Sequence, residues 1–127
     1  MNTVQVTDDY GNHIDLTLDS ATGLVTSMTD PDDQVYRYDY NTDNHLEIVT
    51  FPADGSAPAP FLQYHYDSSE PGLITSITDE NGDLYKTIKY DEQGRAILSG
   101  LNDGSIGDSH FDYSLLDGEA LIIDLRP

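Results

Sequence analysis

Carboxylates are the side chains of this sequence best suited to chemistry. The chain has 24 Asp and Glu against 5 Lys and Arg. Asp79, Asn81 and Asp83 have the D-x-N-x-D spacing that can offer three oxygen ligands to a hard cation such as calcium. An EF-hand loop also needs Gly at its sixth position and Glu at its twelfth, and here those positions hold Leu84 and Tyr90. Turn formation explains the same residues without a metal, so we expect neither a metal nor another cofactor.

Tyrosine is the second residue type with a binding chemistry, because aromatic rings stack on sugars and nine Tyr are present. Tyr is also favoured in strands and gains much from burial, so packing between strands accounts for the same positions. Both interpretations stay open. The residues of this candidate binding surface are Tyr36, Tyr38, Tyr40, Tyr64, Tyr66 and Tyr90.

Catalytic constellations are not specified by this sequence. With so many carboxylates, pairs at the separation used by glycosidases arise by chance. His13, His45, His65 and His110 are scattered without metal-ligand spacing, and we expect His65 to face solvent. The absence of cysteine excludes disulfides and thiol chemistry. We therefore expect that the protein is not an enzyme.

Net charge and hydrophobicity limit the classes of binding partner and the cellular location. The formal net charge of −19 disfavours binding to nucleic acid or to anionic membranes, which requires clustered cations. No run reaches the roughly 18 apolar residues of a membrane span. The first residues resemble no signal peptide. The location stays open between the cytoplasm and export with a dedicated secretion system.

The elements that must position these residues recur along the chain. The residues that close the first strand of each repeat are separated by 22, 26, 24 and 23 positions, and T-S-M-T-D at 26–30 returns as T-S-I-T-D at 75–79. A period between 20 and 50 residues indicates a repeat array in which each unit is stabilised by its neighbours. The residues that mark the period are Leu18, Tyr40, Tyr66, Tyr90 and Tyr113.

Local patterns predict strands joined by tight turns. Tyr36, Tyr38 and Tyr40 alternate with polar residues, as expected for a half-buried strand. Asn81-Gly82 is a strong hairpin signal, and Pro52–Pro60 should be a surface loop. We expect an all-β domain over residues 1–127, with about five antiparallel hairpin repeats forming a twisted, curled sheet. Its core would include Ile77, Ile88, Tyr90 and Leu98.

Two segments resemble the Rhs or YD-repeat family. They are G-L-V-T-S-M-T-D-P-D-D-Q-V-Y-R-Y-D-Y from Gly23 and the longer Tyr64–Ile97, in which T-D-E-N-G is followed by Y-D-E-Q-G-R-A. The recognisable repeats cover Gly23 to Leu98. The resemblance implies β-hairpin units wound into a long sheet, which in full-length members closes into a hollow shell around a C-terminal toxin.

The resemblance implies a structural role. Five units are too few to close such a shell, and Ile123–Pro127 is unlike a toxin domain, so we expect a wall fragment or a short stand-alone member. Its partner would be another polypeptide, favoured if basic, or a second copy that covers exposed sheet edges. The alternative is a carbohydrate- or calcium-binding surface module.

Overall fold

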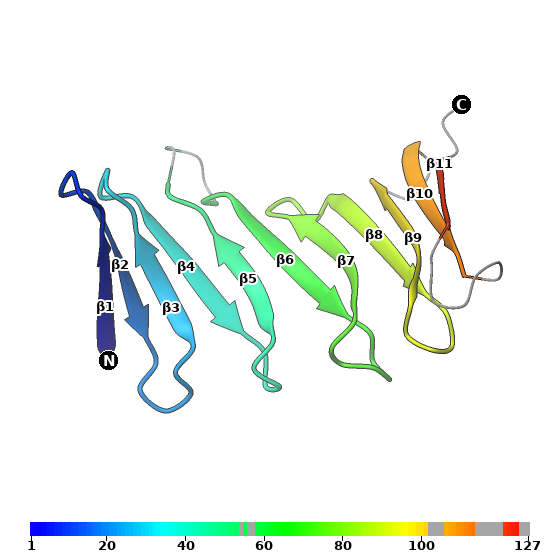
Figure 1. Ribbon diagram of the computed structural model, residues 1–127, viewed down its shortest axis with the longest axis horizontal. Coiled ribbons are helices and arrows are strands. Elements are labelled where there is room, and N and C mark those ends of the chain that lie inside the picture. Colours follow the sequence, from blue (N-terminus) through cyan, green and yellow to red (C-terminus); the bar gives the residue numbers. More distant parts are fainter. Residues whose placement is uncertain (54, 56–57, 102–105, 114–120, 125–127) are drawn as a thin grey trace. The chain divides into compact units, whose positions relative to one another are not determined.

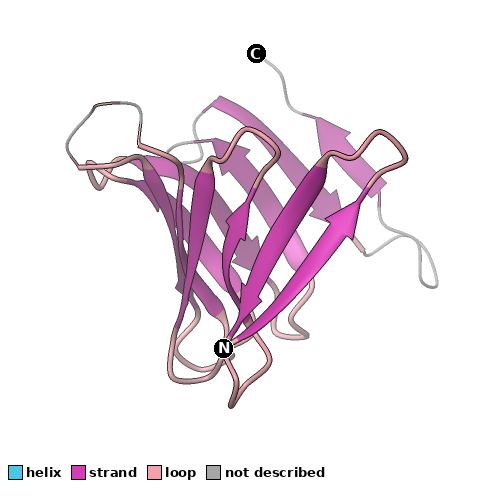
Figure 2. Ribbon diagram, turned by 90° about the vertical axis from the view of Figure 1, so that its left-hand side faces the viewer, coloured by secondary structure: helices cyan, strands magenta, loops and turns pink. Residues whose placement is uncertain are grey.

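The computed structural model describes residues 1–127 except 54, 56–57, 102–105, 114–120 and 125–127. Over these described residues the chain consists of strands, turns and loops without a helix, which confirms the all-β prediction (Figure 2). The same residues hold no helix long and apolar enough to cross a membrane. The eleven strands are β1 (Asn2–Thr7), β2 (His13–Leu18), β3 (Val25–Thr29), β4 (Val35–Tyr40), β5 (Leu46–Thr50), β6 (Phe61–Tyr66), β7 (Ile74–Asp79), β8 (Leu84–Tyr90), β9 (Ala96–Leu101), β10 (Ile106–Asp112) and β11 (Leu121–Asp124).

The chain divides into two compact units, Met1–Leu62 and Gln63–Pro127. In the first unit β1 to β5 pair in chain order, each antiparallel to the next (Figure 1). In the second unit β7 to β11 pair in the same way. Each unit is therefore a run of hairpins, as the repeat period predicts. A single domain over residues 1–127 stays a prediction.

The strand that follows several turns contains a bulge of one residue. Leu18 pairs with Val25, Tyr40 with Leu46 and Tyr90 with Ala96, and in each case the pairing of the preceding residue skips one position of the partner strand. The skipped residues are Thr26 in β3, Glu47 in β5 and Ile97 in β9. A bulge bends the strand that contains it. The marker residues of the sequence period thus lie opposite the point at which the next strand bends.

The predicted core is only half-buried. Among the described residues no hydrophobic side chain is fully buried, and Ile77, Ile88, Tyr90 and Leu98 are all partly exposed. The expectation of a core was wrong in this respect, because neighbouring strands cover the flanks of each side chain while no second layer is described over its end. The apolar residues of β1 are more open still, with Val4 at 45% and Val6 at 54% exposure.

The described residues between β5 and β6 form neither helix nor strand, as the prolines predict. The Phe51 amide donates to the Pro60 carbonyl over 2.8 Å, which brings the two ends of the loop together. Tyr36 and Phe51 make an edge-to-face contact with ring centroids 6.2 Å apart. These contacts anchor the insertion at the base of β4 and β5.

Candidate binding site at the repeat turns

The turns share one hydrogen-bonding design, seen clearly at Asp91. Its Oδ1 accepts the backbone amides of Gln93 at 3.0 Å and Arg95 at 2.9 Å. Its own amide donates to the Arg95 carbonyl, and the Gly94 amide donates to the Asp91 carbonyl. A side chain that satisfies turn amides in this way is an Asx turn, for which Asp and Asn are the preferred residues. The same two side-chain bonds occur in turns that begin at Asp8, Asp30, Asn41 and Asp79.

The fourth residue of each five-residue turn has a left-handed backbone. Gly94 has φ 74° and Gly82 has φ 81°, whereas Asp33 and Asn44 take this conformation at φ 60° and 63°. Glycine, Asn and Asp are the residues that adopt it at least cost. The sequence pattern of Asx followed three residues later by Gly, Asn or Asp is therefore required by the backbone.

Two turns are longer and begin at Asp19 and Asp67. The Asp67 Oδ1 accepts the amides of Ser69 and Glu70 and the Ser69 hydroxyl, which lies 2.6 Å away. The Asp19 Oδ1 accepts the amides of Ala21 and Thr22 and the Thr22 hydroxyl. Both aspartates therefore organise the first half of a wider turn.

Hydrogen bonds to the charged form keep several turn carboxylates ionised. Accepted hydrogen bonds stabilise a carboxylate and so lower its pKa. The pKa is lowered at four turn aspartates. At Asp8 the largest cause is the Asn12 side-chain amide, and at Asp67 it is the Ser69 hydroxyl. At Asp19 and Asp91 it is a backbone amide, that of Thr22 and that of Arg95 respectively.

The marker tyrosines join neighbouring strands through their hydroxyls. Tyr40 donates to the Val25 carbonyl over 2.8 Å, and Tyr90 donates to the Ile74 carbonyl over the same distance. Burial raises the pKa of both hydroxyls, so they remain protonated donors. Sequence reasoning assigned these residues to packing or sugar stacking and missed the hydrogen bond. Their fixed position just before the turn was the signal that could have revealed it.

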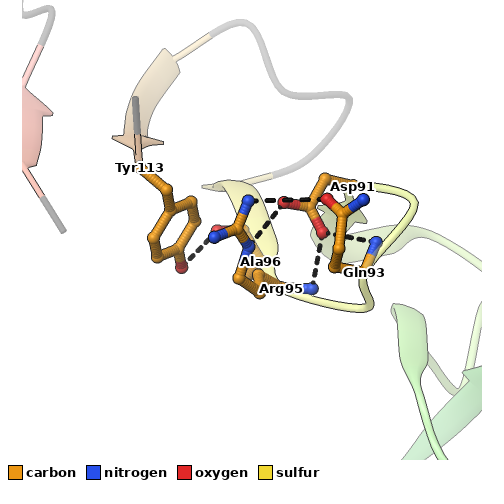
Figure 3. A network of polar contacts seen from close by, with 5 residues as sticks. All are labelled: Asp91, Gln93, Arg95, Ala96 and Tyr113. Atoms are coloured by element: carbon orange, nitrogen blue, oxygen red, sulfur yellow. Dashed lines mark hydrogen bonds and ion pairs between the residues drawn. The ribbon is translucent and has the colours of Figure 1, made fainter. Parts of the chain in front are cut away.

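A third tyrosine bond belongs to a polar network in the second unit (Figure 3). Tyr113 donates to the Ala96 carbonyl over 2.9 Å, and its ring lies 4.4 Å from the Arg95 guanidinium carbon. Arg95 Nε in turn donates to Asp91 Oδ2 over 2.8 Å. The network ties the β8–β9 turn to the residue that follows β10 and offsets part of the Asp91 charge.

The predicted tyrosine surface is distributed over both units. Tyr36, Tyr38 and Tyr40 share the more buried face of β4, as their alternation predicts. Tyr64, Tyr66 and Tyr90 belong to the second unit and are also half-buried. His65 was expected to face solvent. It is half-buried instead, and its Nε2 lies 2.9 Å from the Thr78 hydroxyl of β7, because the adjacent strand covers it.

The candidate calcium ligands Asp79, Asn81 and Asp83 lie in one turn, where the Asp79 side chain accepts backbone hydrogen bonds. Asp79 Oδ1 accepts the amides of Asn81 and Asp83, each at 2.9 Å. Over the described residues, no three His, Asp or Glu side chains gather closely enough to hold a metal ion. Calcium binding by these residues stays part of the alternative hypothesis, a carbohydrate- or calcium-binding surface module.

A groove in the second unit lies between the β6–β7 and β8–β9 turns. Its volume is about 1090 Å³. Leu73, Ile88 and Ile97 supply apolar surface, and four carboxylates line it with the single cation of Lys89. The two turns approach closely, since a Cβ placed on Gly94 would lie 3.8 Å from Leu73 Cδ1. The carboxylates belong to Asp67, Glu70, Asp91 and Glu92.

Comparison with known proteins adds one finding. Residues 20–57 match the family model described as RHS Repeat. The match covers the β2–β3 turn, strands β3 to β5 and the start of the following loop, which all lie in the first unit. No curated protein sequence matches the chain.

Proposed function

We propose that the chain is a member of the Rhs/YD-repeat family, whose repeat model matches residues 20–57, and that it is a non-catalytic wall segment that covers or binds another polypeptide. The supporting observation is the half-buried state of its hydrophobic side chains. Apolar surface left without a covering layer marks a place where another chain can pack. Val35, Tyr85 and Leu101 are exposed by 39%, 53% and 49% in addition to the valines of β1.

A basic polypeptide is the preferred partner in this proposal. The net charge of −19 attracts cationic chains and repels acidic ones over a Debye length of about 8 Å at physiological salt. It also opposes nucleic acids and anionic membranes, which we do not count among the partners. A second copy of the chain is the other candidate partner, but it must overcome the same repulsion.

The non-catalytic role is supported by what the reactive groups do. Asp91 and its counterparts accept turn amides, and the Tyr40 and Tyr90 hydroxyls donate to backbone carbonyls. Groups committed to such bonds stabilise the fold. Their regular recurrence in the repeats accounts for them without a reaction.

Protection from protease tests the proposed function. A reduced, alkylated and fluorescently labelled basic polypeptide is digested with and without an excess of the chain, and an acidic polypeptide of equal length serves as control. We expect slower digestion of the basic polypeptide at low salt, and recovery of the normal rate at high salt. Equal digestion rates with and without the chain would refute the proposal.

The carbohydrate- or calcium-binding module is the alternative, favoured by the row of half-buried tyrosines on one face of β4. A glycan array tests the first form, with Tyr38→Ala as the variant that should lose binding. Calorimetry with calcium tests the second, with Asp79→Asn as the matched variant. Glycan binding that Tyr38→Ala abolishes would favour this module over a polypeptide-binding wall.

A further inference from the structure

We propose that the groove between the β6–β7 and β8–β9 turns docks a basic segment of an extended polypeptide, with lysine or arginine stems on its apolar floor and their charged ends on its carboxylate rim. The proposal rests on the proposed function and specifies where the polypeptide binds. The floor is Leu73, Ile88 and Ile97, which are half-buried. The rim includes Glu70 and Glu92, which are exposed at the turns.

Segregation of charge from apolar surface makes this groove suited to lysine and arginine. Both side chains have an aliphatic stem and a cationic end, and they bury the stem while the end stays near water or a carboxylate. Leucine and isoleucine on the floor with glutamates at the mouth provide both environments. A surface with carboxylates alone would attract any cation, whether or not it had an aliphatic stem.

The carboxylate at Asp67 remains available to an incoming cation. Its Oδ1 accepts the Ser69 and Glu70 amides, and no described partner binds its Oδ2. Asp91 contributes less, because Arg95 Nε donates to its Oδ2. The cation-binding part of the rim is therefore Asp67, Glu70 and Glu92, opposed by Lys89.

The first unit contains the equivalent positions with a different chemistry. Tyr40 corresponds to Tyr90, since both hydroxyls donate to the strand before them. Tyr40 pairs with Leu46 and Tyr90 with Ala96, so Glu47 corresponds to Ile97. The first unit thus places a charge at a floor position, while Thr22 and Thr42 stand where the second unit has Glu70 and Glu92.

Binding of a defined probe tests the groove. The probe is a fluorescein-labelled octapeptide in which lysine and leucine alternate, and fluorescence anisotropy is recorded at low and high salt. The same peptide with glutamate for lysine is the negative control. We expect saturable binding of the lysine peptide that weakens as salt screens the charges.

Variants separate the groove from bulk attraction to an acidic protein. The double substitution Glu70→Thr and Glu92→Thr copies the rim of the first unit and should weaken probe binding about tenfold. Ile97→Gln removes apolar surface from the floor without changing the charge of the groove and should weaken binding at least as much. The matched control, Asp9→Thr with Asp43→Thr, removes two exposed turn carboxylates outside the groove and should change affinity less than twofold.

Each outcome decides the proposal. Equal loss of affinity in the rim and control variants would mean that the probe is held by the overall negative charge, and it would overturn the proposal. Failure of the wild-type chain to bind the probe would overturn it as well. Circular dichroism checks the fold of Ile97→Gln, and the exposed rim variant carries the test if that variant unfolds. Protease protection that persists in the groove variants would leave the proposed function standing and place the binding surface elsewhere.

Discussion

The turn pairs of the two units have the same backbone design and different surfaces. Asp91 and Asn41 accept the same amides, and Tyr90 and Tyr40 donate to equivalent carbonyls. Around this shared frame Ile97 replaces Glu47. The difference teaches that hydrogen bonding within a repeat restricts only a few positions, while the positions between them are free to acquire a binding surface.

Substitution of Gly94, which is equivalent to Asn44, should have the largest effect on the free energy of unfolding. Both occupy the left-handed turn position, at φ 74° and 63°. Gly94→Val should cost about 2 kcal/mol in free energy of unfolding, because a β-branched residue is strained there. Gly94→Asn should cost less than about 0.5 kcal/mol, since Asn tolerates this backbone. Urea denaturation measures both, and equal losses would show that the two positions are not equivalent.

Loss of the turn acceptor should have the next largest effect. Asn41→Ala removes the acceptor of the Asp43 and His45 amides and should cost about 1.5 kcal/mol. Asn41→Asp keeps the acceptor and should be nearly neutral, as Asp91 indicates. The free energy of unfolding from urea titrations compares the two variants. A similar cost for both would mean that the side-chain oxygen is unimportant.

Removal of the tyrosine hydroxyls should have a moderate effect in each unit. Tyr40→Phe and Tyr90→Phe should each cost about 1 kcal/mol, because a part-buried carbonyl loses its donor. Tyr85→Phe, at a side chain exposed by 53%, is the matched control and should change little. Thermal and urea unfolding report the effect. A cost in one unit alone would break the comparison between them.

These tyrosines also predict alkaline sensitivity. The pKa of Tyr40 and of Tyr90 is raised above the usual value of 10.0 by burial. The contribution to stability is therefore complete below pH 10 and lost as the pH rises through the folded-state pKa. Unfolding of the double Tyr→Phe variant should lack this alkaline component, and an unchanged alkaline profile would contradict the assignment.

The smallest expected effect is at acid pH. The pKa of Asp91 is below its usual 3.8, so its contribution is present above that value and is lost as the pH falls through the folded-state pKa. Asp91→Asn should flatten this part of the stability profile, as an Asn already serves at position 41. The melting temperature followed by circular dichroism between neutral and acid pH measures the difference, with Asp9→Asn as control.

Much of the architecture could be predicted from the sequence. Period-2 alternation located Tyr36, Tyr38 and Tyr40 on one face, and Asn81-Gly82 located a turn. These signals are local, so they depend on few other residues. The Tyr90 bond to the Ile74 carbonyl could not be predicted, because it requires the strand register, which the sequence pattern does not reveal.

The candidate site shows the same limit more strongly. Glu70 and Ile97 are far apart in sequence and have no motif in common, and only the pairing of β7, β8 and β9 brings them to one groove. The core residues were placed on the correct strands, but their degree of burial depends on covering layers that periodicity does not reveal. Sequence patterns therefore specified the repeat better than its surface.

An NMR titration with the lysine and leucine octapeptide tests the comparison most directly. Amide shifts should change in the turns of the second unit, at Asp67–Leu73 and Asp91–Arg95. The equivalent turns of the first unit, at Asp19–Leu24 and Asn41–His45, should change little under the same conditions. Equal shifts in both turn pairs, or shifts confined to the first unit, would contradict the claim that the turns of the second unit bind the peptide and the equivalent turns of the first unit do not.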